Sequence, residues 1–364
     1  MRCLITLSVV APFALSAQQP PRLMLAPANA TLAEEFSNLT WARELKDGRV
    51  IVTDGRDGRL VIADLRTHQV QPISRSGQGP GEYPRALPVW SIGGDSSVMI
   101  DGPRRWLLFD GPRVVATLAP DNPAVAATRG LSRGADALGH VFSAEFVAGR
   151  NGPIGDSTAL VRVARATART DTLTRLKALV PRQASAPDAK GFFEFTMPTI
   201  GTAEEFEPFL DGWVAVVRVD PYRVDWRSPD GRWTNGASLP FPIVRMDDGE
   251  KRAYVARIAK ATGKAAAPVE SIKDWPANVP PYKSPAVLLA APDGRVLVPR
   301  LASADHPETR YDIVNRRGLL DGQLTMPPNE RIVSFGAKSA YVAVTDDDGI
   351  QRLRRHPWPP AAAK

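Results

Sequence analysis

Short stretches of alternating apolar and polar residues, separated by turns rich in Gly, Pro, Asn and Asp, recur along most of this chain. In residues 45–73, Val50 and Val52, and later Leu60 and Ile62, recur two positions apart on either side of a Gly-Arg-Asp-Gly turn. Alternation with a period of two is typical of a strand with one buried face. This stretch therefore predicts two half-buried strands joined by a tight turn.

Five further stretches of the same kind follow, with a repeat of roughly 40–50 residues. They are residues 90–118, 137–176, 206–239, 285–326 and 331–358. Strand triplets repeated at this spacing are typical of a β-propeller. We therefore expect an all-β, six-bladed β-propeller that occupies residues 31–358 as one domain, because closed all-β folds commonly reach this length.

One segment interrupts the strand pattern. Residues 250–264 read EKRAYVARIAKATGK, and Ala253, Val255 and Ile258 form an apolar stripe at helical spacing. They predict one short helix, inserted between blades four and five. The last blade contains only three recognisable strands, so we expect residues 31–41 to supply its fourth strand and close the ring.

The first 17 residues have the pattern of a signal peptide. Arg2 is followed by an apolar run from Cys3 to Ala17 that ends in small residues. This run is shorter than the roughly 20 residues of a membrane-spanning helix. We therefore expect an exported protein, periplasmic or secreted and without a membrane span, with residues 18–30 as an extended arm and 359–364 as a tail. Since Cys3 is the only cysteine, the mature chain would contain no disulfide.

The formal net charge of +7 could suit nucleic acid or an anionic surface. However, the basic residues are spread along the chain, with neither a dense run nor an interleaved aromatic platform. Export also argues against a nucleic-acid partner. We expect no nucleic-acid binding and a monomeric protein.

Several stretches resemble a bacterial six-bladed β-propeller family that is distantly related to NHL-repeat proteins. They are the loop GQGPGEY (77–83), the strand WLLFD (106–110) and the closing region that begins PPYKSPAVLLAAPDGRVLVPR (280–300). The resemblance covers roughly residues 45–357. It implies an exported propeller but no particular chemistry, since most such proteins have no assigned activity.

In NHL-type blades the second strand often ends in Asp with Arg close behind, and Asp54, Asp101 and Asp220 match this pattern. Such a carboxylate can accept turn N–H bonds and pair with Arg, which is a structural role. Alternatively, the Asp and Arg residues form a polar ring at one mouth of the channel. On this second interpretation, the expected ligand-binding residues are Arg75, Glu82, Tyr83, Asp101, Tyr282 and Arg300.

The Gly-rich loop at residues 77–82 does not match a phosphate-binding loop. No Lys-Ser/Thr pair follows it, and Pro84 and Pro88 oppose the helix that such loops require. Gly79 and Gly81 instead suit a tight turn. Glu82 would either contact a ligand or bind backbone amides of its own loop.

We therefore expect a binding or scaffold module, without a cofactor, whose ligand is a small molecule, a glycan or a protein. The alternative is a hydrolase of the lactonase or esterase type with Ca²⁺ in the channel, held by carboxylates such as Glu82, Asp101 and Asp220. The chain contains no HExxH motif, GxSxG elbow or catalytic cysteine, so no catalytic residue is assigned. Three or more converging carboxylate or Asn side chains would favour the hydrolase, and a lining of Arg, Tyr and Trp would favour binding.

Overall fold

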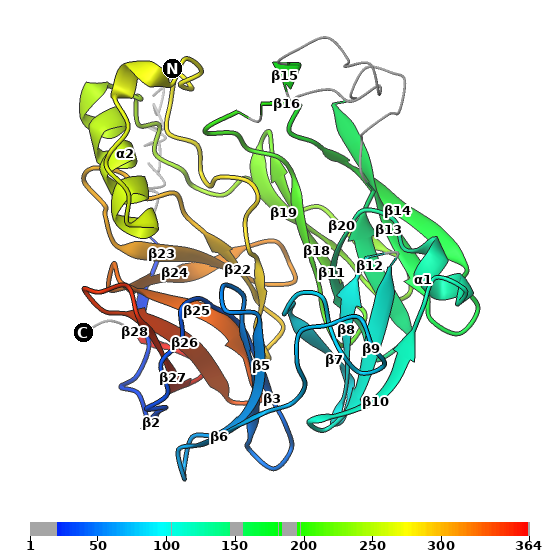
Figure 1. The fold of residues 1–364 in the computed structure, drawn as a ribbon. Helices are drawn as coiled ribbons and strands as arrows, with labels where there is room; N and C mark the ends of the chain where they lie inside the picture. Colours follow the sequence, from blue (N-terminus) through cyan, green and yellow to red (C-terminus); the bar gives the residue numbers. More distant parts are fainter. Residues whose placement is uncertain are drawn as a thin grey trace, which may run out of the picture.

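The computed structural model describes residues 20–102, 104–145, 156–180, 182–183, 195–196 and 198–362. Six sheets, each built on four antiparallel strands, are arranged as blades around a central channel (Figure 1). The fold is a six-bladed β-propeller, which confirms the architecture predicted from the repeated strand pattern.

The first strand of each blade lies beside the channel and contacts the first strands of the two neighbouring blades. These six innermost strands are β3 (Leu39–Glu44), β7 (Val89–Gly93), β11 (Leu131–Ala135), β17 (Glu205–Pro208), β21 (Leu289–Ala290) and β25 (Glu330–Phe335). Together they form the wall of the channel.

The remaining strands of each blade follow outward from the channel. The second strands are β4 (Val50–Asp54), β8 (Ser96–Asp101), β12 (His140–Ala144), β18 (Val214–Val219), β22 (Val296–Pro299) and β26 (Ser339–Thr345). The third strands are β5 (Arg59–Asp64), β9 (Arg105–Asp110), β13 (Ser157–Ala164), β19 (Tyr222–Arg227), β23 (Thr309–Val314) and β27 (Gln351–Pro357). The fourth strands are β6 (Gln69–Pro72), β10 (Arg113–Leu118), β14 (Thr170–Lys177), β20 (Trp233–Thr234), β24 (Leu320–Met326) and, in blade six, β2 (Ala30–Thr31).

The ring is closed by the segment that precedes blade one. Strand β2 pairs antiparallel with β27. A little further on, the N–H of Phe36 donates to the carbonyl of Gln351 at 2.9 Å, and the N–H of Gln351 donates to the carbonyl of Phe36 at 2.8 Å. The expected closure is therefore present, but through residues 30–36, because Leu39–Glu44 already forms the innermost strand of blade one.

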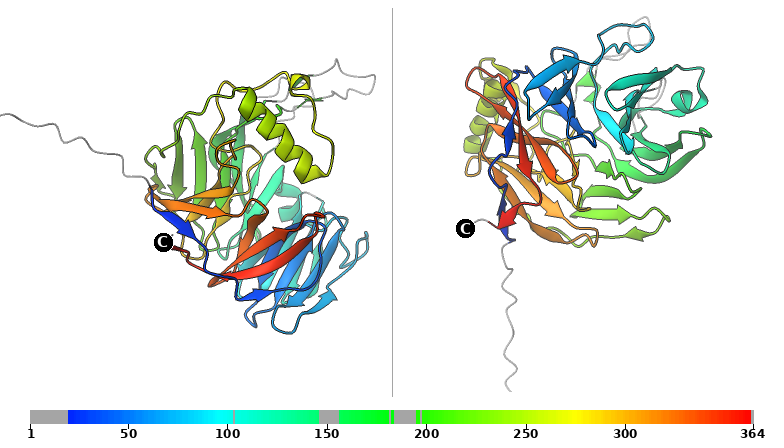
Figure 2. Two further views of the ribbon diagram at one scale, coloured as in Figure 1. Left: turned by 90° about the vertical axis from the view of Figure 1, so that its left-hand side faces the viewer. Right: turned by 90° about the horizontal axis from the view of Figure 1, so that it is seen from below.

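Both ends of the described chain lie on the outer edge of blade five. Strand β1 (Arg22–Met24) runs parallel to β24, and β28 (Ala361–Ala362) pairs antiparallel with β1. Blade five is consequently a six-stranded sheet, with its two added strands on the outside (Figure 2). A separate two-stranded hairpin consists of β15 (Arg182–Gln183) and β16 (Phe195–Thr196).

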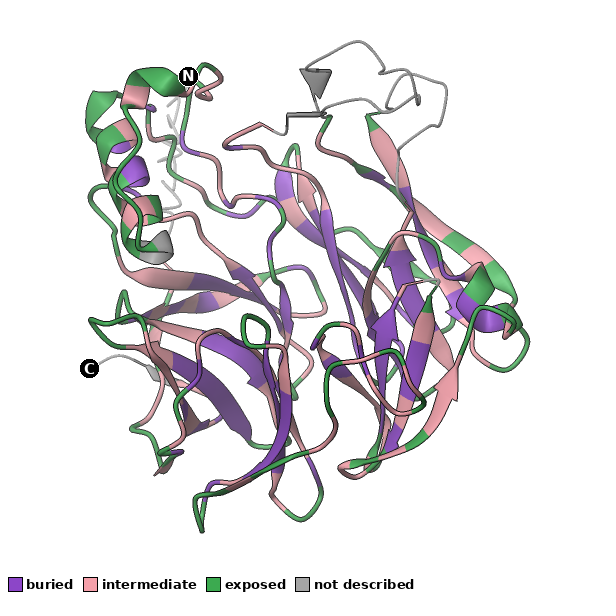
Figure 3. Ribbon diagram, in the orientation of Figure 1, coloured by how far each residue is buried: buried purple, intermediate pink, exposed green. Residues whose placement is uncertain are grey.

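The core lies between the blades. Among the described residues, each of the six pairs of neighbouring blades encloses its own cluster of buried apolar side chains. Buried residues accordingly follow the strands, whereas turns and outer edges are exposed (Figure 3). Because a blade buries its faces only against its neighbours, the stability of each blade depends on an intact ring.

Helix α2 (Asp248–Thr262) is the expected insertion between blades four and five. Asp247 caps its N-terminus by accepting the N–H of Glu250 at 2.9 Å, and Gly263 ends it at φ +65°. Glu250, Tyr254 and Val255 are buried, whereas the predicted stripe residue Ile258 is 43% exposed. Helix α1 (Pro123–Ala127) and the 3-10 helix η1 (Val269–Ser271) were not expected. In the described part of the chain, no helix has the length and apolar character needed to cross a membrane.

Candidate functional site

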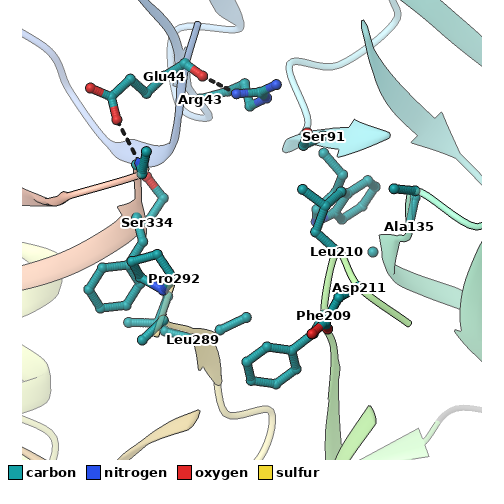
Figure 4. A pocket seen from close by; sticks show the side chains of 18 of the residues that line it. Arg43, Glu44, Ser91, Ala135, Phe209, Leu210, Asp211, Leu289, Pro292 and Ser334 are labelled. Carbon is teal, nitrogen blue, oxygen red and sulfur yellow. Dashed lines mark hydrogen bonds between the residues drawn. The ribbon is translucent and has the colours of Figure 1, made fainter. Parts of the chain in front are cut away.

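A cavity of about 800 Å³ opens at one end of the central channel, where a turn joins the innermost strand of each blade to the second. We call this end of the channel the inner-turn end. Residues of all six blades surround the cavity (Figure 4). Its aromatic and charged lining consists of Trp41, Arg43, Glu44, Lys46, Trp90, Glu207, Phe209, Asp211, Arg316 and Phe335.

Alternation along the innermost strands determines which side chains reach this cavity. On β3, Ala42 packs in the cluster between blades one and six, so Trp41 and Arg43 lie together on the other side of the strand. On β17, Phe206 packs between blades three and four, and Glu207 faces the channel. The period of two thus brings an aromatic, a basic and an acidic side chain to one cavity.

Two tryptophans form an aromatic wall. The ring centroids of Trp41 and Trp90 lie 6.4 Å apart at an interplanar angle of 65°, an edge contact that aromatic quadrupoles favour. Trp41 Nε1 donates to the carbonyl of Val89 at 2.9 Å, which fixes its ring. Both side chains are only partly buried, so apolar ring surface faces the cavity.

Arg316 reaches the opposite side of the cavity already paired. Its Nη2 lies 2.7 Å from Asp211 Oδ2. The guanidinium carbon is 5.4 Å from the ring centroid of Phe209 and 4.9 Å from that of Trp213, within cation–π range. Arg316 is therefore held by one carboxylate and two aromatic faces.

Arg43 has a different environment, because within the described part of the chain its guanidinium donates only to carbonyl oxygens. Nη1 donates to the carbonyl of Glu44, Nη2 donates to the carbonyl of Gly94 at 2.6 Å, and the buried Nε has no partner among the described residues. Burial lowers the pKa of Arg43, while Asp95 and Glu44 act in the opposite direction. The guanidinium charge is thus partly desolvated without a directly bonded carboxylate.

Glu207 faces the cavity from β17 and is 9% exposed. Burial raises its pKa well above the ordinary value, and the neighbouring Arg133 offsets this only in part. Arg133 is itself engaged, since its Nη2 lies 2.8 Å from Glu205 Oε2 and its Nη1 donates to the carbonyl of Ala286 at 2.6 Å. The surroundings of Glu207 therefore favour its neutral, protonated form.

A glutamine at this position should change how stability depends on pH. Because the pKa of Glu207 is raised in the folded state, the folded protein binds more protons than the unfolded chain above pH 4.5, and stability falls as pH rises toward that raised value. Glu207→Gln removes this loss, so its free energy of unfolding should improve relative to the parent protein as pH increases. Urea unfolding from pH 4.5 to 8 measures the difference. Glu270→Gln, at an exposed position, is the control and should show no such trend.

The predicted binding residue Glu82 is enclosed by its own loop. Its carboxylate accepts the N–H of Gly79 at 2.8 Å and pairs with Arg75 Nε at 2.6 Å, and both contacts lower its pKa. A Cβ at Gly77 would lie 2.0 Å from Glu82 Oε2, and Gly81 has φ +77°, so the loop requires glycine to wrap around this side chain. Of the two roles considered for Glu82, the bond to its own loop is the one observed.

Two predicted binding residues are core aromatics. Tyr83 and Tyr282 are each 1% exposed. The Tyr83 hydroxyl donates to the carbonyl of Ser74 at 3.2 Å and accepts the N–H of Leu60 at 3.0 Å. The Tyr282 hydroxyl donates to the carbonyl of Ala203 at 2.6 Å. These local backbone partners satisfy the hydroxyls and allow both rings to be buried.

The other two predicted residues sit at the ends of second strands. Asp101 pairs with Arg85 at 3.0 Å rather than with an Arg that follows it, and Arg300 pairs with Asp312 at 3.0 Å. Both lie at the end of the channel opposite the cavity. None of the six predicted residues is among those that line the cavity, and ligand binding by this set remains a prediction.

The carboxylates considered as calcium ligands have other surroundings. Glu82 is bound by its own loop and Asp101 pairs with Arg85. Asp54, which was considered only as a strand-end carboxylate, has the structural role, because it is fully buried and accepts the N–H groups of Ser37, Asn38 and Arg56 at 2.8–3.1 Å. Asp220 is exposed at the turn between β18 and β19. Within the described part of the chain, no three His, Cys, Asp or Glu side chains form a group that could hold a metal ion.

The cavity residues Trp41, Arg43 and Glu207 were not among those predicted from the sequence. Trp90, a further cavity residue, packs in part against the cluster between blades two and three. A usable signal was present in the Trp-Ala-Arg-Glu stretch at residues 41–44, which alternates directly before the first turn of blade one. Assigning this stretch to an innermost strand would have placed Trp41 and Arg43 in the channel.

No protein-family model matches this chain, and no curated protein sequence matches it. Solved structures that resemble it include regucalcin, a calcium-binding protein from Agrobacterium tumefaciens (12% identity, covering 94% of this chain and 99% of that one, TM-score 0.43). They also include a member of the DUF4221 family from Bacteroides vulgatus (9%, 95% and 100%, 0.49) and a Bacteroides fragilis protein that is thought to be exported (11%, 94% and 94%, 0.49). These likenesses concern the fold alone, and the strand order of this chain itself establishes the six-bladed propeller.

Proposed function

We propose that this protein is exported and binds a small organic ligand in the cavity at the inner-turn end of the channel. The observation that supports this is the lining, in which two tryptophans, two phenylalanines and two arginines from different blades face one space. Small-molecule sites are concave and largely apolar, with a few polar groups, and usually enclose about 300–1,000 Å³. At about 800 Å³, the cavity falls in this range.

The alternative, a calcium-dependent hydrolase, is less well supported. Ca²⁺ is held by about six to eight oxygen ligands, and carboxylates from several blades would have to provide them. Of the acids that line the cavity, Asp211 pairs with Arg316, Glu44 accepts the N–H of Ala337 at 2.9 Å, and burial raises the pKa of Glu207. The lining therefore favours binding of an organic molecule.

Thermal unfolding of the mature chain against a library of small acids, amides, amines and sugars tests the proposal. A ligand that binds only the folded protein raises the unfolding midpoint. For such a ligand, Trp90→Ala should weaken binding at least about tenfold in calorimetric titration, because a large aromatic contact is removed. Trp233→Ala is the matched control, since Trp233 lies on the outer strand β20 away from the cavity and should leave binding unchanged.

Two results would count against this function. One is a library in which no compound raises the midpoint, and the other is a ligand that binds Trp90→Ala as tightly as the parent protein. A midpoint that rises with Ca²⁺ and returns to its starting value with EDTA would instead favour the hydrolase.

A further inference from the structure

Trp41 and Arg43 provide neighbouring apolar and cationic groups in the cavity. They stand two positions apart on β3 and face the same side, and Trp90 of blade two lies against Trp41. A ligand that lies on these indoles would have its edge near the Arg43 guanidinium. The arrangement thus offers two indole rings set at an angle to one another, with a positive charge beside them.

The charge on Arg43 lacks a carboxylate partner, unlike that of Arg316 across the cavity. The acidic groups whose charge acts on Arg43 are Asp95 and Glu44, and both are engaged elsewhere. Asp95 Oδ1 accepts the N–H of Lys46 at 2.8 Å, and Glu44 accepts that of Ala337. Nη1 and Nη2 each donate to one carbonyl and keep a second N–H for an anion, whereas the unpartnered Nε is itself buried. Charge-assisted contact with a carboxylate suits such a guanidinium.

The charges around the cavity leave a small positive balance, although Glu44 and Asp95 lie close enough to act on Arg43. Asp211 is compensated by Arg316, and Lys46 adds a second positive charge on the blade-one side. Burial disfavours the ionised form of Glu207. With Glu207 neutral, the three cations Arg43, Lys46 and Arg316 face the two carboxylates Glu44 and Asp211, so the lining carries a net charge of +1.

We infer that the ligand of this cavity is an aromatic carboxylate, with its ring against Trp41 and Trp90 and its carboxylate on Arg43. This inference rests on the proposed function and narrows it to one chemical class. Ring stacking supplies apolar contact, and the charge-assisted hydrogen bonds to the guanidinium fix the orientation of the ligand.

Three matched probes test the inference by calorimetric titration of the mature chain. They are 2-naphthoate, its neutral amide 2-naphthamide, and decahydro-2-naphthoate, which keeps the charge but has no aromatic ring. We expect 2-naphthoate to bind about tenfold more tightly than the amide. It should bind at least about threefold more tightly than the saturated acid. An amide that binds as tightly as the acid, or a saturated acid that binds as tightly as the aromatic one, overturns the ligand class.

Arg43→Met removes the charge and keeps an unbranched side chain. It should weaken the binding of 2-naphthoate at least about tenfold and leave the binding of 2-naphthamide unchanged. Arg43→Lys should retain part of the preference for the acid over the amide. Arg49→Met is the matched control, because Arg49 pairs with Asp47 on the same turn and does not line the cavity. Equal weakening by Arg43→Met and Arg49→Met would show that net charge alone matters and would overturn the contact.

The two proposals fail in different ways. If 2-naphthamide and other neutral compounds bind through Trp90 but no carboxylate is preferred, the binding function stands and the ligand class is wrong. If none of the probes and no library compound binds, both are wrong. Since Arg43 also donates to Gly94, thermal unfolding of each variant checks that it is folded, and the comparison of probes on the parent protein requires no variant.

Discussion

Phe36→Ala is expected to lower the free energy of unfolding by about 3–5 kcal/mol, the usual cost of truncating a buried aromatic side chain. Phe36 is 1% exposed and lies in the cluster between blades one and six, beside Leu32 and Tyr341. Its backbone exchanges two hydrogen bonds with Gln351. The truncation would therefore leave a void in the core where the two ends of the ring meet. Since the total stability of a domain is about 5–15 kcal/mol, the loss would be large.

Urea unfolding at neutral pH measures this effect. Ile243→Ala is the control, because Ile243 is 79% exposed and its truncation should change stability by less than about 0.5 kcal/mol. A loss below about 1 kcal/mol for Phe36→Ala would mean that the closing segment contributes little to the stability of the ring.

Asp312→Ala should be comparably severe, at about 3–5 kcal/mol, because it removes one partner of a buried ion pair. Asp312 is fully buried and accepts hydrogen bonds from Tyr222 Oη at 2.8 Å, Arg300 Nη1 at 3.0 Å and Gln323 Nε2 at 2.8 Å. Arg300 is only 5% exposed on its side chain, and its guanidinium lies over the ring of Phe241 at 4.6 Å. Without Asp312, this cation would stay buried without its carboxylate.

Two further variants separate the unpaired charge from general damage. The double variant Arg300→Met with Asp312→Ala should recover much of the loss, since no lone charge is left in the interior. Asp230→Ala, which breaks the exposed pair with Arg232, should cost less than about 1 kcal/mol. If the double variant were less stable than Asp312→Ala alone, the penalty would not come from the stranded guanidinium.

The blades could be predicted from the sequence because the second and third strands are short apolar runs bounded by turn residues. The expectation of half-buried strands was wrong for blade one, because both faces of the blade pack against neighbouring blades. Strand β4 is buried at every position, and β5 is buried at its four central ones. The innermost strands carry a weaker signal, since β21 has only two residues and β3 presents Trp41 and Arg43 to the channel rather than to the core. The position of the innermost strands is determined by the packing of the whole ring and not by their local sequence pattern.

The predicted binding residues could not be located in the same way. Tyr83 and Tyr282 occur in polar, Pro-rich loops, where an aromatic side chain resembles an exposed contact. Their burial depends on backbone partners such as the carbonyls of Ser74 and Ala203, which a local pattern does not reveal. Which end of the channel is hollow depends on the packing of six turns, and so on contacts far apart in sequence.

The way the ring closes also has a consequence for how the chain folds. The residues that complete blades five and six stand at the start of the chain, and the bond between His356 Nδ1 and the carbonyl of Ala26 spans 330 positions. In a nascent chain, the face of blade one that packs against blade six is therefore exposed until blade six has been synthesised. Such high contact order slows folding, and the unpaired strands are prone to aggregation in the meantime. We therefore expect the ring to close only after translation. A chaperone bound before that step would give the first and last segments more time to pair.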